Sequence, residues 1–250
     1  RLAPEPVGAA AFIPGATIAA HGSDEQRALL DQVAAGKCLL AFAHTEPGRR
    51  GMTESATRAT TDGTTWAITG AKSPVLAGDS ADVLLVSAAL PEGGTGLFLV
   101  DVAAAGPAVT RVGYRTFDGQ RGADIAFDGA AAQPLGSGGD AAAAIAETVI
   151  RFQAALCAEA VGAMDESLRL TTEYLKTRKQ FGVPLKTFQT LTQRAADMYV
   201  SLELARSMSF YASMCVADDR FDPVVAARTK MQIGRSGKHI AQESIQLHGG

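Results

Sequence analysis

Apolar residues in the second half of the chain recur every three or four positions, which is the period of an α-helix. One series predicts a helix from about 140 to 179, and a second predicts a helix from about 188 to 216. Asp222-Pro223 is typical of a helix start and opens a third helix. Three long antiparallel helices predict an incomplete bundle over 138–250, because a closed bundle needs a fourth. The apolar positions are Ile145, Val149, Phe152 and Leu156 in the first helix and Leu191, Ala195, Met198, Leu202 and Ala205 in the second.

The pattern between 37 and 137 has a shorter period, with brief apolar runs separated by glycine, proline and polar residues. Asp62-Gly63 between two such runs is a strong signal for a tight hairpin. The runs predict an antiparallel middle β domain of barrel or sandwich type. Gly136 to Gly139 joins this domain to the helices. The expected strands are 38–45, 57–61, 64–69, 81–88, 96–101, 108–112 and 123–127.

Residues 1–36 are expected to form the end of an N-terminal helical domain. An Ala-rich stretch over 6–20 predicts one helix in spite of Pro14-Gly15. Ser23 and Gln26 have the spacing of a capping box and predict a second helix that ends near Ala35. The whole chain is therefore expected to have an α+β fold of three successive parts.

Composition and charge narrow the class of protein. The chain has 250 residues, of which 47% are hydrophobic and 20% charged, which fits a globular protein with a sizeable core. Its formal net charge of -3 gives no broad basic field for nucleic acid. Cys38, Cys157 and Cys215 are widely spaced, which favours free thiols in a reducing compartment over a metal site. The sequence shows neither a membrane span nor a leader, so we expect a cytoplasmic protein.

The stretch from Thr177 to Gln189 carries the most specific chemistry. Arg178 closes the first long helical pattern, and the next helix begins beyond the break at Gly182 and Pro184. A guanidinium is a permanently charged fork that pairs with phosphates, and a helix N-terminus favours anions. These residues indicate a phosphate site between two helices. An arginine that merely covers a helix end is the alternative.

Three motifs resemble the acyl-CoA dehydrogenase family and occur in its order. A-F-A-H-T-E-P-G (Ala41 to Gly48) resembles the family's strand that ends in T-E-P-G. R-K-Q-F-G (Arg178 to Gly182), with Gln189, resembles its diphosphate-binding segment, and I-Q-L-H-G-G (Ile245 to Gly250) resembles its late Q-x-x-G-G. The runs K-S-P-V-L-A-G and C-A-E-A-V-G-A-M are most similar to the pimeloyl-CoA dehydrogenase small-subunit group. Compared with that group, the N-terminal helices and the end of the bundle would be missing.

The resemblance implies two half-sites for FAD. In the family, the strand before T-E-P-G lies along the flavin ring, which assigns Phe42, His44 and Thr45 to the flavin. Thr45 would bond the ring's polar edge through its hydroxyl and backbone. The later motifs of the family reach the ADP half of FAD in a neighbouring subunit, where the arginine pairs with the diphosphate. They imply cofactor contacts from Arg178, Phe181, Gln189, Gln246, Gly249 and Gly250. For His44 and Gln246 the ordinary alternatives are a core residue and a solvated helix residue.

The family's catalytic base is not matched. Its reaction is α,β-dehydrogenation of an acyl-CoA thioester, in which a glutamate with a pKa raised by burial removes the α-proton. One family position for this glutamate lies past Gly250, and the other precedes an arginine early in the first bundle helix. Arg151 matches that arginine and is the substrate-side candidate, but Ile150 stands before it and cannot be a base. The base is expected beyond the chain's end or on a partner, and Glu147 and Glu159 are interpreted as structural.

Two further departures lie on the flavin and substrate side. The family's W-I-T-N-G, whose Trp and Thr touch the flavin, is replaced by the run from Ser73 to Gly78, and Trp66 does not take its place. The A-G-S-D that normally follows T-E-P-G is replaced by Arg49-Arg50-Gly51-Met52, whose charges either meet CoA phosphates or are solvated. Because the diphosphate motif is intact, this asymmetry suggests a subunit that completes a partner's FAD site and has a weakened or absent site of its own.

The resemblance therefore implies a FAD-dependent acyl-CoA dehydrogenase. It would pass electrons to an electron-transfer flavoprotein and form a dimer or tetramer with itself or a homologous subunit. It is expected to act as the small subunit of a two-component enzyme. The alternative is a non-catalytic scaffold subunit that completes a partner's FAD site. A DNA-associated relative of the family is disfavoured by the net charge of -3 and by the lack of a Lys/Arg stripe.

Overall fold

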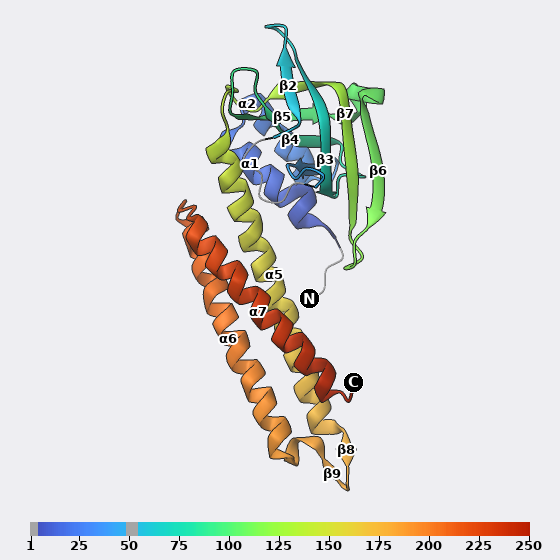
Figure 1. The fold of residues 1–250 in the computed structure, drawn as a ribbon, viewed down its shortest axis with the longest axis vertical. Coiled ribbons are helices and arrows are strands. Elements are labelled where there is room, and N and C mark those ends of the chain that lie inside the picture. Colours follow the sequence, from blue (N-terminus) through green and yellow to red (C-terminus); the bar gives the residue numbers. More distant parts are fainter. Residues whose placement is uncertain (1–4, 49–54) are drawn as a thin grey trace. The chain divides into compact units, whose positions relative to one another are not determined.

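The computed structural model describes residues 5–48 and 55–250, which form two compact units (Figure 1). The division falls between Thr148 and Val149, inside the long helix α5 (Ala142–Thr177). The first unit contains the sheet, and the second is helical. Within the described ranges, none of the helices is long and apolar enough to span a bilayer.

The sheet of the first unit has seven strands, one for each expected run. The pairings β4–β2–β3–β7–β5–β4 close a ring, as in a barrel, while β1 pairs with β4 and β6 with β7. Two connecting turns, α4 (Val102–Ala105) and η2 (Gly106–Ala108), were not expected. The strands are β1 (Leu40–Ala43), β2 (Arg58–Thr61), β3 (Trp66–Leu76), β4 (Val83–Ala89), β5 (Thr95–Asp101), β6 (Val109–Arg115) and β7 (Arg121–Pro134).

The expectation of a wholly antiparallel sheet is wrong at β1. This strand pairs with β4 in parallel, with Phe42 beside Leu85 and Ala43 beside Val86. A single residue pair between β2 and β4 is parallel as well. Because side chains alternate along a strand, Ala41 and Ala43 enter the apolar core of the sheet, and Phe42 lies on the opposite face.

The N-terminal elements pack in the same unit as the sheet. The segment consists of η1 (Gly8–Phe12), α1 (Ile13–His21), α2 (Asp24–Arg27) and α3 (Leu29–Ala34), so the second expected helix is in fact two short ones. The capping box is confirmed, because Gln26 N donates to Ser23 Oγ at 3.3 Å and Ser23 N to Gln26 Oε1 at 3.1 Å. The Gln26 side chain also donates to Pro134 O and accepts from Gly136 N, both at 2.8 Å.

The glycine-rich join that follows the sheet is held closely against this segment. Gly136 has a φ of +58°, and a Cβ there would lie 2.3 Å from the His21 carbonyl oxygen. Only glycine fits such an approach.

The helical unit contains the rest of α5, α6 (Gln189–Ala217) and α7 (Pro223–Leu247), as expected. Asp222 caps α7 by accepting from Val224 N at 2.7 Å. The break between α5 and α6 forms the small hairpin β8 (Lys179–Gln180) and β9 (Val183–Pro184), followed by η3 (Leu185–Thr187), which the sequence pattern did not indicate.

The apolar series of α6 is confirmed, and that of α5 needs correction. Met198, Leu202 and Ala205 are buried, whereas Leu156 on α5 is exposed. The buried stripe of α5 passes one position later, through Cys157, and continues in steps of four, three and four residues. The core of the helical unit is formed by Cys157, Val161, Met164, Leu168, Leu175, Met198, Leu202, Ala205, Ile233, Ile240 and Leu247.

Candidate cofactor site

Two rings predicted to face a flavin stand together on the non-core face of β1. The Phe42 and His44 rings are stacked, with centroids 5.4 Å apart and planes inclined by 6°. Both side chains are half-buried, and Thr45 beyond them is exposed. The Thr45 carbonyl accepts from Ser73 N at 2.8 Å, which ties the end of β1 to β3. The structure therefore brings the three residues of this predicted half-site to one edge of the sheet.

A buried lysine lies directly behind this half-site. Lys72 on β3 is fully buried, and its Nζ lies 2.8 Å from Glu46 Oε1 and 3.1 Å from Ser87 Oγ. It also donates to the His44 carbonyl at 3.1 Å, and Ser55 Oγ lies at 3.3 Å. We did not identify this group from the sequence, because lysine normally marks a solvated position. The sequence contained one indication of this lysine, the Glu46 of T-E-P-G, because a buried carboxylate needs a positively charged partner.

Glu46 is held ionised by its surroundings. Ser55 Oγ donates to its carboxylate at 2.6 Å, and the backbone N–H groups of Ala56 and Thr57 donate at 2.8 and 2.9 Å. Burial by itself would raise the pKa of this carboxyl, but the bonds from Lys72, Ser55 and the two N–H groups lower it well below its usual range. Burial lowers the pKa of Lys72, and Glu46 opposes that shift. The result is a buried ion pair.

His44 is neutral at neutral pH. Its Nδ1 lies 2.9 Å from Ser87 Oγ. Burial and the positive charge of Lys72 lower the pKa of the imidazole to about 4, with Glu46 opposing the shift. The ring therefore presents polar nitrogen atoms without a charge.

The segment that replaces the family's W-I-T-N-G continues β3. Pro74 is exposed, Val75 is buried and Leu76 is half-buried, so no aromatic ring or hydroxyl stands at these three positions. The Ser73 hydroxyl donates to Asp124. Trp66 packs on Phe98 in the core, with ring centroids 5.2 Å apart, and so does not substitute for the missing ring. Arg49, Arg50, Gly51 and Met52 lie outside the described residues.

The predicted diphosphate residues lie where α5 ends and α6 begins. Arg178 is exposed, and its carbonyl accepts from Leu185 N at 2.9 Å, which closes the β8–β9 hairpin. Phe181 at the hairpin tip is 92% exposed, has a φ of +55° and meets Phe188 edge to face at 6.2 Å. Gln189 is the first residue of α6 and is exposed.

The C-terminal motif reaches the same end of the helical unit. The rings of Tyr174 on α5 and His248 lie 4.4 Å apart, so the end of α7 lies beside the end of α5. Gln246, Gly249 and Gly250 are exposed there, and Gly249 has a φ of +92°. The six residues assigned to the ADP half of the cofactor are thus gathered on one exposed end.

Arg151, the predicted substrate-side residue, is packed inside the helical unit. Its guanidinium carbon lies 4.9 Å from the centre of the Phe221 ring. Its Nη1 is buried, and no hydrogen-bond partner for it is found in the part of the chain that the structure describes. A buried donor of this kind calls for an acceptor from outside the described residues, such as an ordered water or a ligand.

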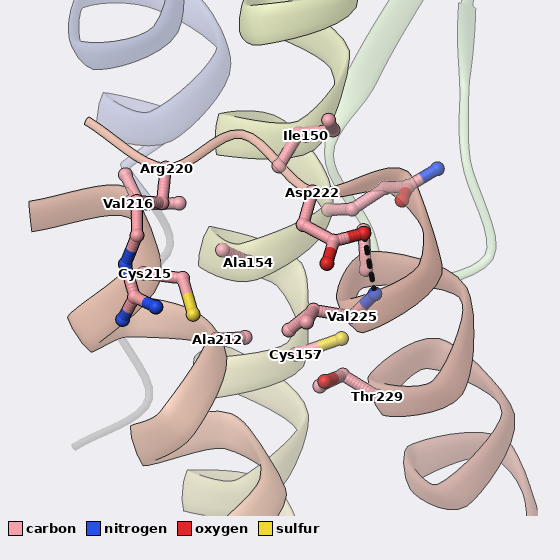
Figure 2. A pocket seen from close by; sticks show the side chains of 12 residues that line it. Ile150, Ala154, Cys157, Ala212, Cys215, Val216, Arg220, Asp222, Val225 and Thr229 are labelled. Carbon is pink, nitrogen blue, oxygen red and sulfur yellow. Dashed lines mark hydrogen bonds between the residues drawn. The ribbon is translucent and has the colours of Figure 1, made fainter. Parts of the chain in front are cut away.

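A pocket in the helical unit lies between α5, the C-terminal end of α6 and the start of α7 (Figure 2). It encloses about 270 Å³ of empty space, a figure that includes open solvent. Two thiols line it, and burial raises the pKa of Cys157, which keeps that thiol protonated. The wall is mostly apolar, formed by Ile150, Ala154, Cys157, Ala212, Cys215 and Val225 among others.

The carboxylates weighed as catalytic bases have ordinary surroundings. Glu147 Oε2 lies 2.9 Å from His21 Nε2. Glu166 forms two hydrogen bonds with Arg169, at 2.7 and 2.8 Å, which lower its pKa, the direction opposite to that of a base. Glu159 is exposed on α5. We therefore keep the interpretation of Glu147 and Glu159 as structural and extend it to Glu166.

Comparison with known proteins gives the family that the three sequence motifs indicated. The family described as "Acyl-CoA dehydrogenase, C-terminal domain" matches residues 142–250. Acyl-CoA dehydrogenase IpdE2 of Mycobacterium tuberculosis is 42% identical over 95 residues, which are 38% of this chain and 28% of that protein.

Two solved structures cover the whole chain. The Tcur3481-Tcur3483 steroid ACAD G363A variant is 33% identical with a TM-score of 0.88, and the ChsE4-ChsE5 complex from Mycobacterium tuberculosis is 26% identical with a TM-score of 0.82. The chain spans 66% of each of those solved chains. The sheet-rich first unit, the helical second unit and these relatives agree with the three motifs, and the chain belongs to the acyl-CoA dehydrogenase family.

Proposed function

We propose that the chain is part of a FAD-dependent acyl-CoA dehydrogenase that carries out α,β-dehydrogenation of an acyl-CoA and passes electrons to an electron-transfer flavoprotein. The observation that carries the proposal is the exposed end of the helical unit. There Arg178, Phe181 and Gln189 present a charged fork, an aromatic ring and an amide to solvent. An exposed aromatic residue beside a free guanidinium suits a ligand with both an apolar and an anionic part.

The residues present fit the two ends of FAD, which when bound supplies the hydride acceptor. On the sheet, the stacked pair Phe42 and His44 offers a flat, half-buried surface with a neutral ring nitrogen, and the exposed Thr45 follows it in the chain. On the helical unit, Arg178 would pair with the diphosphate, and Gln246 and Gly249 would meet the same cofactor half. We infer that the two sets serve two different FAD molecules, as the intersubunit role of the later motifs implies.

On the substrate side, the buried Nη1 of Arg151 is a donor that has no acceptor within residues 5–48 and 55–250. An acyl-CoA thioester carries carbonyl and phosphate oxygens of that kind. Since one solved relative is described as a steroid enzyme, both straight-chain and steroid-derived CoA thioesters belong in the assay.

We further propose that the chain acts with a homologous subunit as the small subunit of a two-component enzyme. Several large apolar side chains on α6 are exposed, which is unfavourable in water and marks an interaction surface. A relative of known structure is itself described as a ChsE4-ChsE5 complex. The alternative is a non-catalytic scaffold subunit. The exposed side chains are Val200, Leu204, Phe210, Tyr211 and Met214.

The test is a flavin spectrum of the purified full protein, alone and after co-expression with a homologous subunit. We expect bound FAD and a dimer or tetramer by light scattering at micromolar concentration. We also expect anaerobic bleaching of the flavin by an acyl-CoA in the assembly. Flavin that is bound but never bleached would favour the scaffold alternative, and a monomer that binds FAD would contradict the intersubunit role. A protein that binds no FAD in either form would refute the proposal.

A further inference from the structure

We propose that Ser87 and Lys72 act as positioning residues that hold His44 in one tautomer, with the proton on Nε2, so that this N–H faces the polar edge of the flavin. The inference rests on the proposed FAD site. It assigns a role to Lys72 on β3, Ser87 on β4 and His44, which follows the end of β1, and the sequence motifs do not connect these three residues.

The direction of the hydrogen bonds fixes the tautomer. An ammonium group has three donors and no acceptor, so Lys72 can only donate. Its three shortest contacts are Glu46 Oε1 at 2.8 Å, and Ser87 Oγ and the His44 carbonyl at 3.1 Å. Ser87 Oγ therefore accepts from Lys72, and its own hydrogen must be donated elsewhere.

The acceptor for that hydrogen is the imidazole. Among the described residues, the other polar atom recorded within hydrogen-bond distance of Ser87 Oγ is His44 Nδ1, at 2.9 Å. Ser87 is fully buried, so leaving its hydroxyl unpaired would cost roughly 1–3 kcal/mol. Nδ1 thus accepts, and in a neutral imidazole the remaining proton is on Nε2.

The sheet register places this group on the face proposed for the flavin. β1 and β4 are parallel and in register, so Phe42 lies beside Leu85, and His44 follows beside Ser87. The Phe42 ring stacks on the imidazole and limits its rotation. Nδ1 accepts from the buried Ser87. Because the ring is only half-buried, Nε2 is left to donate to a ligand.

The Nε2–H donor of His44 would compensate for flavin contacts that the family makes from W-I-T-N-G and that this chain lacks on β3. The run from Ser73 to Gly78 that replaces the family's W-I-T-N-G has no aromatic ring, and its one hydroxyl, that of Ser73, donates to Asp124. The end of β1 is bonded to this segment through Thr45 O and Ser73 N. A neutral N–H donor at His44, just after β1, would supply a hydrogen bond that this part of β3 does not.

The tautomer is measured directly by ¹⁵N NMR of the histidine side chains in the full protein, without reference to FAD. We expect His44 to show an unprotonated Nδ1 and a protonated Nε2 between about pH 5.5 and 8. Ser87→Ala should move the two nitrogen shifts toward each other as both tautomers become populated, and Ser87→Thr, which keeps a hydroxyl, should restore the parent pattern. A parent His44 with the proton on Nδ1, or an unchanged spectrum in a folded Ser87→Ala, would overturn the assignment.

The cofactor side is measured by FAD affinity and by the flavin absorption spectrum of the reconstituted assembly. His44→Leu removes the donor and should weaken FAD binding up to about tenfold, the value of one neutral hydrogen bond. His44→Gln keeps an N–H and should retain most of the affinity, and His239→Leu on α7 is the matched control. Unchanged affinity and spectrum in His44→Leu, with normal binding by the parent, would contradict this inference alone. Failure of the parent to bind FAD would contradict the proposed function instead.

Discussion

Replacing Lys72 by methionine tests whether the buried ion pair is held as the structure indicates. Removing one partner of a buried pair typically costs about 3–5 kcal/mol, because the other charge is left in a poorly solvated place. Glu46 would keep three hydrogen-bond donors, from Ser55, Ala56 and Thr57. We therefore expect the free energy of unfolding to fall by about 3 kcal/mol, the lower end of that range. An exposed pair would give only about 0–1 kcal/mol.

The assay is urea unfolding of the full protein followed by Trp66 fluorescence. Trp66 is the single tryptophan of these 250 residues and packs on the core of the sheet that holds the pair. In a protein of this size, a loss of about 1 kcal/mol in the free energy of unfolding lowers the melting temperature by roughly 2–4 °C. In a thermal melt, Lys72→Met should therefore lower the melting temperature by about 6–12 °C. Lys238→Met, at an exposed lysine on α7, is the control and should change the free energy of unfolding by less than about 0.5 kcal/mol.

A double variant identifies the cause. In Lys72→Met with Glu46→Gln, no charge remains buried, so the double variant should recover about 1–2 kcal/mol relative to Lys72→Met alone. A loss below about 1 kcal/mol in the single variant, or strictly additive losses in the double variant, would refute the reasoning.

Three further predictions concern cofactor binding, catalysis and pH. Arg178→Ala should weaken FAD binding about ten- to a hundredfold, with partial recovery in Arg178→Lys, by equilibrium titration; unchanged affinity would favour the helix-end interpretation. Glu147→Gln, Glu159→Gln and Glu166→Gln in the assembled enzyme should each stay within about tenfold of the parent in single-turnover flavin reduction. A thousandfold loss with FAD bound would identify that glutamate as the base. The pKa of His44 is lowered from 6.5 to about 4, so the unfolded chain binds more protons between these values and stability should rise with pH there, by at most about 3 kcal/mol. His44→Leu should flatten that slope in urea titrations at pH 4.5 and 6.5, and an unchanged slope would contradict the assignment.

The local elements were predictable because their signals are local. Asp62-Gly63 forms the turn between β2 and β3, where Asp62 Oδ1 accepts from Thr64 N at 2.8 Å and Thr65 N at 2.7 Å. Asp222 caps α7, and Ser23 with Gln26 forms the capping box. Each of these contacts joins residues at most three positions apart, so the sequence spacing was sufficient.

The unpredicted features depend on contacts between distant residues. The parallel pairing of β1 joins Leu40 to Val83, and period-two patterns are the same for parallel and antiparallel edges. The burial of Lys72 depends on Ser87, which reaches it from β4, and on Glu46, which reaches it from the segment after β1. Of the candidate site, the sequence therefore predicted, through the family motifs, which residues would contact a cofactor, but it did not predict the polar group behind them.

The tip of the β8–β9 hairpin has a consequence for engineering. Phe181 has a left-handed backbone conformation, which costs a bulky residue roughly 1–2 kcal/mol, and its ring is 92% exposed to water. Neither property favours the folded chain by itself, so a search for stabilising substitutions would select asparagine or glycine at this position. If the ring packs on a cofactor as proposed, the more robust variant would be the less functional one. Stability and cofactor binding then favour different residues at position 181. A variant at this position should therefore be chosen by cofactor binding and not by thermostability.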